Sequence, residues 1–355
     1  MSLDVARAYH LAWRVGHRVP GGLVRALTRV GADVAWWRRG PGVRRLEANL
    51  TRVRPELDER ALRALSRAGM RSYMRYFGEA FTLRGLTPEQ ITARVRAEGL
   101  EHVQPHLDEG RQVVLALGHL GNWDLAGAWA TVHLAPVTTV AERLKPEELF
   151  EEFLAFREAI GLTILPLTGG GDVFRRLTRV ARTGPGLMPL LADRDLTAKG
   201  VEVDLFGHRA RVAAGPAALA VMTGAPLVPT AIVYERLRGA RRRAAGSPWG
   251  IVIRFCPRVP VPADVPRREQ VSALTQAWVD ALARQIHARP QDWHMLQRVF
   301  VADLDPARDT ARRGAGADPG ADRAAADRPD GTTGTTGTTG GSAAGGDVLD
   351  VGHAT

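Results

Sequence analysis

The sequence predicts an α/β fold in which a single domain has a central mixed sheet flanked by helices. Short apolar runs of strand length alternate with segments at helical spacing from about residue 88 to 302, as in a sheet covered on both faces. The hydrophobic fraction of 45% is large enough for a sizeable core. After residue 302 large apolar side chains almost disappear. We therefore expect an α/β domain over residues 51–302 and a disordered tail over 303–355.

Each expected element rests on its own pattern of apolar residues. A long helix is expected over residues 56–83, where apolar side chains recur roughly every three or four positions. A short strand and a helix should follow within 87–110. Further strands are expected at 111–119, 136–142, 162–167, 186–193, 226–235 and 249–257, with a hairpin over 200–212. Further helices are expected just after residue 122 and over 146–161, 170–184, 213–224 and 268–290.

The first 50 residues form a segment of unusual composition. They contain nine arginines and three acidic residues, and Trp13, Trp36 and Trp37 lie among leucines and valines. Residues 9–19 and 22–39 each fit an amphipathic helix with a basic face and an apolar face that bears tryptophan. This composition is typical of helices that lie in a membrane interface. The alternative is a pair of helices that pack on the domain with a solvated arginine face.

The basic charge balance narrows the classes of partner. The net charge is +10, and five arginines and nine aspartates in residues 303–355 leave +14 on residues 1–302. Such a body suits nucleic acid, an anionic membrane or phosphorylated ligands, but no nucleic-acid-binding signature supports the first. The apolar runs are too short or interrupted to cross a bilayer, and residues 1–20 lack a signal-peptide core, so cytoplasmic residence is expected. One cysteine, Cys256, excludes an internal disulfide and a cysteine-based metal site.

Candidate catalytic residues lie at the turn after the strand expected at 111–119. His119 ends this strand, at the edge of the sheet where open α/β folds bind ligands. Asp124, near the start of the next helix, can accept a hydrogen bond from the imidazole, fix its tautomer and stabilise the imidazolium. Asn122 and the free backbone N–H groups of the helix start can cap the turn or hold an anion. The alternative is an ordinary turn, because His and Asp at this spacing recur by chance.

The sequence contains a candidate general base, His119, but no candidate side-chain nucleophile to accompany it. It contains no G-x-S-x-G motif, and Cys256 falls in a strand that we expect to be buried. A base of this kind implies that a hydroxyl of the substrate attacks directly, as in acyl transfer from a thioester. No metal is required, because backbone N–H groups or an arginine can polarise the carbonyl.

The segment GHLGNWDLAG, residues 118–127, resembles the signature of the bacterial lipid A biosynthesis (lauroyl) acyltransferase family. This family shares H-x-x-x-x-D with the wider glycerolipid acyltransferases. Similar segments follow in the expected order at 141–167, 190–196, 206–229 and 292–297. Within the family, the motif ADRDL and the arginine-rich, tryptophan-bearing start resemble the phosphatidylinositol mannoside acyltransferases. The lipid A enzymes usually begin with a membrane-spanning helix, and its absence here favours the mannoside branch.

The resemblance implies a glycerolipid-acyltransferase-like fold and transfer of a fatty acyl chain, such as palmitoyl, from acyl-CoA to a mannose hydroxyl of a phosphatidylinositol mannoside. His119 would be the general base on that hydroxyl, oriented by Asp124, and such a base contributes about 10²–10⁴ in rate. No cofactor is implied, since acyl-CoA is a co-substrate. The enzyme would be peripheral, on an anionic membrane surface at the cytoplasmic face of the cell membrane.

Asn122 and four further positions are expected to bind substrate. Glu142 and Arg157 fall where the mannoside enzymes place residues that shape the acceptor site, and the alternative for both is a structural ion pair. Asp193 and Arg194 end a strand on the same side of the sheet as His119. The resemblance implies that Asp193 accepts from a sugar hydroxyl, although close relatives often carry Glu there. The alternative for Arg194 is a surface charge.

Other assignments stay open at this point. A glycine-rich turn at 168–174 and a basic loop at 237–246 are weaker candidates for contact with the phosphates of CoA or with anionic lipid. An enzyme of the same family could act on a lipid A precursor or another glycolipid. A catalytically silent protein could keep the fold for membrane or lipid binding. A nucleic-acid-binding function would rest on charge alone and predicts duplex binding that weakens steeply with salt.

Overall fold

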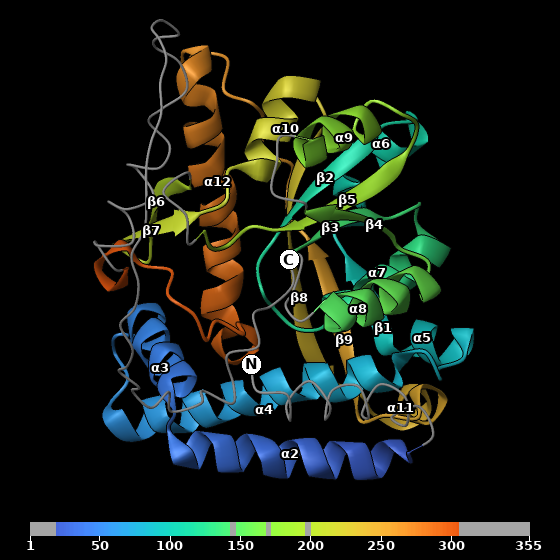
Figure 1. Cartoon of the computed structure of the whole chain (residues 1–355), viewed down its shortest axis with the longest axis vertical. Helices are drawn as coiled ribbons and strands as arrows, with labels where there is room; N and C mark the ends of the chain where they lie inside the picture. Colours follow the sequence, from blue (N-terminus) through green and yellow to red (C-terminus); the bar gives the residue numbers. More distant parts are fainter. Residues whose placement is uncertain (1–18, 143–146, 168–171, 196–199, 305–355) are drawn as a thin grey trace, which may run out of the picture.

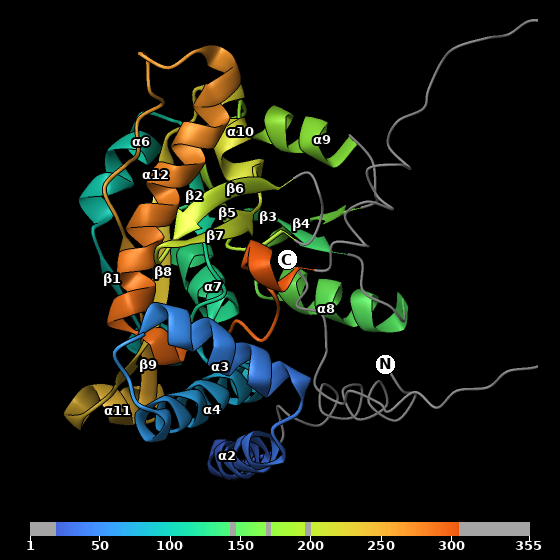
Figure 2. The same cartoon turned by 90° about the vertical axis from the view of Figure 1, so that its left-hand side faces the viewer.

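The structure, a computed structural model, describes residues 19–142, 147–167, 172–195 and 200–304. Its centre is a mixed β-sheet with helices on both faces (Figure 1, Figure 2). This confirms the α/β fold with a central mixed sheet that the sequence predicts. The predicted tail over 303–355 lies outside the described residues from position 305 onward, and so does the first predicted helix up to residue 18.

Five strands form the main sheet in the order β1-β9-β8-β2-β5. The neighbours are parallel except for β8 and β9, which are antiparallel. Their bounds are Val95–Glu98 (β1), Gln112–Leu117 (β2), Gly186–Leu191 (β5), Leu227–Arg236 (β8) and Trp249–Phe255 (β9). A parallel pair, β3 (Thr138–Glu142) and β4 (Thr163–Leu167), continues the sheet beyond β5 through a bridge between Val137 and Leu187. The predicted hairpin is present as β6 (Val201–Leu205) and β7 (His208–Val212).

Strand β2 lies inside the sheet, and all six of its residues are buried. Its side chains alternate between two cores because successive residues of a strand point to opposite faces. Val114 and Ala116 belong to the core on one face of the sheet, whereas Leu115 and Leu117 belong to the core on the other face. The predicted compact apolar strand is therefore confirmed.

Helices cover both faces of the sheet where their apolar faces can be buried (Figure 2). One face carries α9 (Asp172–Val180), α10 (Gly215–Thr223) and α12 (Arg267–Ala288). The other carries α5 (Pro88–Arg94), α6 (Gln104–Asp108), α7 (Trp123–His133) and α8 (Glu147–Ala159). The basic segment at 237–246, expected to be a loop, contains a short helix instead, α11 (Gly239–Ala245).

Three helices form a further layer across one end of the sheet (Figure 1). They are α2 (Gly21–Arg38), α3 (Pro41–Val53) and α4 (Glu59–Leu83), and they share one apolar core. Helix α4 corresponds to the helix predicted over 56–83 and begins where the side chain of Asp58 accepts a hydrogen bond from the N–H of Ala61 at 2.7 Å. None of the helices in the described ranges is long and apolar enough to cross a membrane.

Helix α2 corresponds to the helix predicted over 22–39, and its two tryptophans differ in environment. The indole N–H of Trp36 donates to Oγ of Ser66 at 3.0 Å, and the guanidinium of Arg63 lies 4.0 Å from the ring centre. Trp36 therefore packs on α4, as the alternative interpretation expects. Trp37 is 76% exposed, and Trp13 lies outside the described residues.

Candidate active site

The ends of two neighbouring strands bring His119 and Asp193 together. Strands β2 and β5 are parallel and in register, with Leu117 opposite Leu191. His119 and Asp193 each lie two residues beyond the end of their strand, and Nδ1 of His119 is 2.5 Å from Oδ1 of Asp193. The backbone N–H of His119 donates to Oδ2 of the same carboxylate at 3.0 Å. Both side chains are almost completely buried, so the pair forms a preorganised site in a low-dielectric environment.

The carboxylate of Asp193 is held by a third donor that the sequence did not reveal. The indole N–H of Trp293 donates to Oδ2 of Asp193 at 2.8 Å. The segment that carries Trp293 is fixed to the same turn, since the N–H of His294 donates to the carbonyl oxygen of His119 at 2.7 Å. In the sequence, the segment 292–297 shows a resemblance to the family, but no pattern there gives Trp293 a role.

The charge on Asp193 determines which nitrogen of His119 is available for chemistry. Burial acts to raise the pKa of Asp193, but the adjacent His119 ring and the N–H donors around the carboxylate outweigh it and leave the pKa below its usual value. An ionised carboxylate can only accept hydrogen bonds, so Nδ1 of His119 carries the proton. In a neutral imidazole with this tautomer, Nε2 holds the lone pair and can act as a base.

The turn between β2 and α7 is shaped by its backbone and by Asn122. Gly121 has a φ of 62°, and a Cβ there would lie 2.3 Å from the carbonyl oxygen of Ile232 on β8. Only glycine fits this close approach. The side chain of Asn122 accepts from the N–H of Leu125 at 3.0 Å and donates to Glu79 at 2.8 Å. Asn122 therefore caps α7, which is one of the two roles expected for it.

Asp124 does not contact the His119 ring, and this part of the sequence-based prediction is corrected. Its carboxylate accepts from Nε of Arg157 at 2.9 Å and from the hydroxyl of Tyr76 at 2.8 Å. The physical reason is direction: Asp124 in the first turn of α7 faces α4 and α8, whereas the imidazole faces the end of β5. Asp193 takes the position in which Asp124 was expected.

Asp124, Arg157 and Tyr76 form a buried polar cluster that joins three helices. Burial acts to lower the pKa of Arg157, but the charge of Asp124 outweighs it and leaves the pKa above its usual value. Burial, reinforced by Asp124, raises the pKa of Tyr76 well above its usual value. At neutral pH the cluster is thus an ion pair with a neutral phenol. The alternative expected for Arg157, a structural ion pair, is what the structure shows, although its partner is Asp124 rather than Glu142.

Two other predicted residues lie at or just beyond the ends of strands. Glu142 is the last residue of β3, and its side chain lies outside the described part. Arg194 follows Asp193 directly and is half-buried; among the described residues it forms no hydrogen bond or ion pair. Of the glycine-rich turn at 168–174, residues 168–171 lie outside the described part. The structure thus brings only Asp193 directly against His119.

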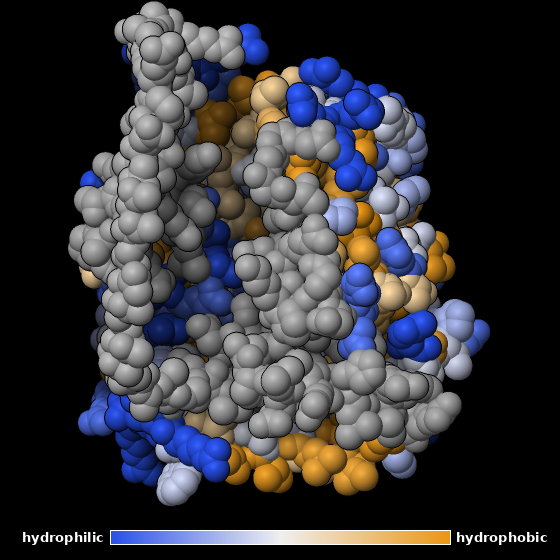
Figure 3. Space-filling view, in the orientation of Figure 1, coloured by the Kyte–Doolittle hydropathy of each residue, from blue (hydrophilic) through white to orange (hydrophobic). Residues whose placement is uncertain are grey.

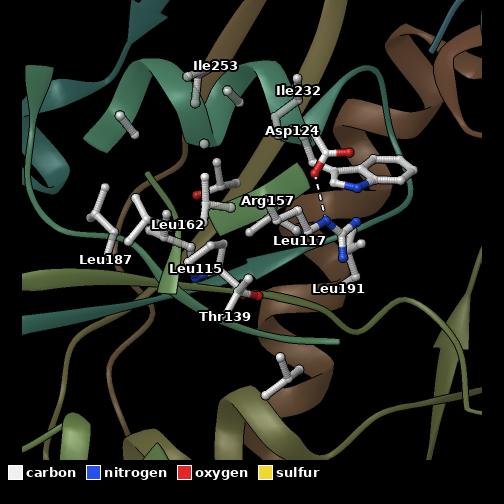
Figure 4. A pocket seen from close by; sticks show the side chains of 18 of the residues that line it. Leu115, Leu117, Asp124, Thr139, Arg157, Leu162, Leu187, Leu191, Ile232 and Ile253 are labelled. Atoms are coloured by element: carbon white, nitrogen blue, oxygen red, sulfur yellow. Dashed lines mark hydrogen bonds and ion pairs between the residues drawn. The ribbon is translucent and has the colours of Figure 1, made fainter. Parts of the chain in front are cut away.

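An apolar cavity opens beside the buried cluster and runs between α7 and the sheet (Figure 4). One wall is the face of α7 that carries Trp123, Ala126, Gly127 and Ala130, which recur at i, i+3, i+4 and i+7. The opposite walls come mainly from the strands, with Leu115, Leu117, Leu187, Leu191, Ile232 and Ile253. Small residues on α7 leave the space that the branched side chains do not fill.

The polar end of this cavity lies close to the imidazole. Asp124 and Arg157 line the cavity, and the rings of Trp123 and His119 have centres 5.8 Å apart. The arrangement can hold a hydrocarbon chain along α7 while the reactive end of that chain reaches the base. No group of three or more His, Cys, Asp or Glu side chains within the described residues could hold a metal ion.

A buried imidazole–carboxylate pair close to one end of an apolar cavity defines a site for proton transfer on a lipid-like substrate. Residues 5–301 match the bacterial lipid A biosynthesis acyltransferase family, and the chain belongs to that family. It is an acyltransferase, as the resemblance of GHLGNWDLAG and the later segments predicts.

Curated relatives support the mannoside branch. The phosphatidylinositol mannoside acyltransferase of Mycolicibacterium smegmatis is 38% identical over 300 residues, which cover 84% of this chain and 92% of the relative. That of Mycobacterium tuberculosis is also 38% identical, over 304 residues that cover 85% and 90%. The crystal structure of the 1-acyl-sn-glycerophosphate acyltransferase of Thermotoga maritima is 13% identical and covers 75% of this chain and 98% of that one, with a TM-score of 0.34. That score is too low to add to the assignment.

Proposed function

We propose that the protein transfers a fatty acyl chain, palmitoyl in the first instance, from acyl-CoA to a mannose hydroxyl of a phosphatidylinositol mannoside. The observation that carries this proposal is the His119–Asp193 pair close to the polar end of an apolar cavity, beside its lining residue Trp123. The acceptor is suggested by the names of the relatives at 38% identity. The donor is suggested by the site, which has a base and space for an acyl chain.

In the proposed mechanism, Nε2 of His119 takes the proton from the attacking hydroxyl. The hydroxyl oxygen forms a bond to the thioester carbonyl carbon, and a tetrahedral intermediate results. This intermediate collapses with cleavage of the carbon–sulfur bond, and the CoA thiolate leaves with the proton from Nε2. Asp193 holds Nδ1–H throughout and stabilises the imidazolium that exists between the two proton transfers. A base of this kind contributes about 10²–10⁴ in rate.

The cluster of Asp124, Arg157 and Tyr76 has a positioning role in this proposal. It ties the first turn of α7 to α4 and α8 at the end of the cavity nearest His119. The same helix forms one wall of the cavity. The cluster therefore fixes the position of the carbonyl end of the bound acyl chain. Asp124 therefore acts through the position of α7 and not through the imidazole.

The direct test is product formation with a choice of acceptors. Purified protein is given palmitoyl-CoA with a phosphatidylinositol mannoside or with a lipid A precursor, and released CoA and the acylated lipid are measured. We expect acceptor-dependent release with the mannoside and a product heavier by one palmitoyl group. Release with the lipid A precursor alone would keep the chemistry and overturn the proposed acceptor. No release with either would overturn the proposed activity.

The role of the cavity is tested by filling it. Ala130 lies about 9 Å along α7 from Asp124, at a rise of about 1.5 Å per residue, and it faces the cavity. Ala130→Phe should lower kcat/KM for palmitoyl-CoA about 10-fold or more and leave short acyl-CoA donors nearly unaffected. The matched control is Val132→Phe, because Val132 lies on the same helix and is exposed. Equal losses for long and short donors would contradict a chain-binding cavity.

We further propose that the enzyme works as a peripheral protein at the cytoplasmic face of the cell membrane, with α2 as its membrane contact. Five large apolar side chains of this helix are exposed: Leu23, Leu27, Val30, Val34 and Trp37. Their spacing places them on one face, opposite the face that packs on α4. Figure 3 shows hydrophobic surface along the edge of the molecule where Figure 1 draws α2. We call these five residues the α2 stripe.

A further inference from the structure

An arginine-rich groove lies between α2 and α4, away from the active site. Its volume is about 530 Å³, and its walls include five arginines and the indole of Trp249. The arginines are Arg25, Arg29, Arg71, Arg75 and Arg236. None of the described residues that line this groove is acidic. A hollow with this lining concentrates positive potential, because low-dielectric walls focus the field of the charges.

The arginines converge from three elements. Arg25 and Arg29 are one turn apart on α2, Arg71 and Arg75 are one turn apart on α4, and Arg236 ends β8. Trp249 on β9 fixes two of them by cation–π contact. The guanidinium of Arg75 lies 3.6 Å from the centre of the indole, and that of Arg236 lies 4.5 Å away. The guanidinium groups of Arg75 and Arg236 are therefore held at the groove rather than free to separate in solvent.

Most of these arginines form no ion pair within the described part of the chain. Arg71 pairs with Asp33 at 2.6 Å, and the same carboxylate also binds Arg67, which does not line the groove. Across the described ranges, Arg25, Arg29, Arg75 and Arg236 form no ion pair with a carboxylate. Glu79 lines an adjoining cavity together with Arg25 and Arg75, and the charge of Arg75 acts on it, but its hydrogen bonds go to Asn122 and Tyr234. Four gathered like charges repel one another, and an anion that binds between them removes this repulsion.

The groove borders the α2 stripe. Val30 belongs to both, and Ala26, one turn before it, also lines the groove. If the stripe lies in the acyl layer of a bilayer, the groove opens at the level of the headgroups. Guanidinium groups bind phosphate oxygens through paired N–H donors, which makes arginine well suited to a phosphodiester.

We propose that this groove binds the phosphate of an anionic phospholipid in the membrane on which the enzyme works. The proposal rests on the proposed membrane contact of α2 and adds a defined headgroup site to it. The site is separate from the acyl-transfer centre, so the bound lipid is a membrane anchor and not the acyl acceptor. It orients the enzyme, because the stripe and the groove together fix the rotation of α2 about its own axis.

The test compares two double variants of the full chain that each remove two positive charges. Arg29→Gln with Arg236→Gln changes two exposed groove arginines, and Arg258→Gln with Arg267→Gln changes two exposed arginines elsewhere. Arg267 starts α12, at the end of that helix away from α2 (Figure 1). Binding is measured by co-sedimentation with phosphatidylcholine vesicles that contain or lack phosphatidylglycerol, after confirming equal unfolding midpoints.

We expect the groove variant to bind phosphatidylglycerol vesicles about 10- to 30-fold more weakly than wild type, and the control variant to lose less than about 3-fold. Binding to pure phosphatidylcholine should not change. CoA release from detergent-dispersed substrates should also be unchanged in the groove variant. Equal losses in the two variants would overturn the site and leave only general electrostatic attraction.

Two further arms separate this proposal from the proposed function. Leu27→Ser with Trp37→Ser removes apolar area from the stripe and should weaken binding to both kinds of vesicle. Wild-type binding by this variant would overturn the membrane contact itself, whatever the groove does. Inorganic phosphate is the soluble probe. Binding of phosphate that the groove variant abolishes, with vesicle binding unaltered, would make the groove a site for a free anion and overturn its assignment to lipid.

Discussion

Charged side chains form ion pairs at the active site, whereas most of those at the α2 surface do not. At the active site, His119 is paired with Asp193, and Arg157 with Asp124. At the groove beside α2, four arginines are gathered that form no ion pair with a carboxylate in the described part of the chain. A buried charge must be neutralised within the protein, since leaving it unpaired is strongly unfavourable. A surface charge can be left for a partner to neutralise.

Apolar side chains show the same contrast. Those beside the active site are buried and line a cavity between α7 and the sheet, whereas those of the α2 stripe are exposed on one face of a helix. The first arrangement suits a single hydrocarbon chain inside the protein. The second suits a hydrocarbon layer outside it. The difference indicates that the protein binds lipid in two distinct ways. Variants in the two regions should therefore lose different properties: activity or stability at the active site, and membrane binding at the α2 stripe.

The largest effect is expected from breaking the buried ion pair. Asp124→Ala leaves the guanidinium of Arg157 buried without its partner and should lower the free energy of unfolding by about 3–5 kcal/mol. Urea denaturation measures this. Arg157→Met in the same chain removes the unpaired charge and should restore part of the loss. If the single variant loses less than about 1 kcal/mol, the buried pair is not a structural brace.

A large pH effect is expected from His294. Its ring contacts Oγ of Ser72 at 3.0 Å, and burial, with the charges of Arg75 and His119, lowers its pKa to about 3. In the unfolded chain the imidazole of His294 binds a proton as the pH falls below about 6.5, whereas in the folded chain it stays neutral until about pH 3. This group therefore removes stability as the pH falls from 6.5 towards 3, by about 1.4 kcal/mol per pH unit.

The measurement is the slope of unfolding free energy against pH in wild type and in His294→Asn. The variant should have a smaller slope between pH 4 and 6, by about the amount that one proton contributes. His287→Asn, at an exposed position of α12, is the control and should keep the wild-type slope. Parallel curves for wild type and His294→Asn would show that His294 does not titrate differently in the two states.

A smaller effect is expected from the indole that holds Asp193. Trp293→Phe keeps an aromatic ring in the core but removes the N–H that donates to Oδ2. The loss should be about 1–2 kcal/mol of stability and about 10-fold in kcat. Because the change acts through Asp193, the acidic limb of the kcat–pH profile should also move. Lower stability with an unchanged kcat and profile would restrict Trp293 to packing.

The smallest effect on stability is expected at the α2 stripe. Leu27→Ser and Trp37→Ser change exposed side chains and should alter the unfolding free energy by no more than about 0.5 kcal/mol. Thermal unfolding measures this. A loss of several kcal/mol would mean that the stripe is covered by protein, and the contrast between the two regions would then disappear.

Much of the fold follows from local pattern. Strand β2 is a continuous apolar run and α4 has a clear helical period, so both were predicted close to their observed bounds. The helix α11 was missed because its sequence, GARRRAA, has no apolar face and reads as a loop. The sequence could not predict that Trp36 packs on α4 while Trp37 is exposed, because only the packing of α2 on α4 distinguishes these adjacent positions.

The candidate site was only partly predictable. His119 lies at the end of β2 as expected, but Asp193 is 74 residues away in the chain and Asp124 only five, and the nearer carboxylate was chosen. One signal pointed to the correct partner: both residues follow their strands by two positions, and parallel strands in register bring such positions together. Nothing in the sequence marks Trp293 as a donor to that carboxylate, because this contact depends on how the chain returns after α12.

The central claim is that His119 works as a unit with Asp193 and not with Asp124. The most direct measurement is a double-mutant cycle on kcat for CoA release in the presence of acceptor, using His119→Ala, Asp193→Asn, Asp124→Asn and the two double variants that contain His119→Ala. We expect Asp193→Asn to lose about 10²-fold or more, and the His119/Asp193 double variant to be no worse than His119→Ala alone, because residues of one catalytic unit are not additive. Losses at His119 and Asp193 that multiply, with non-additive losses at His119 and Asp124, would contradict the account.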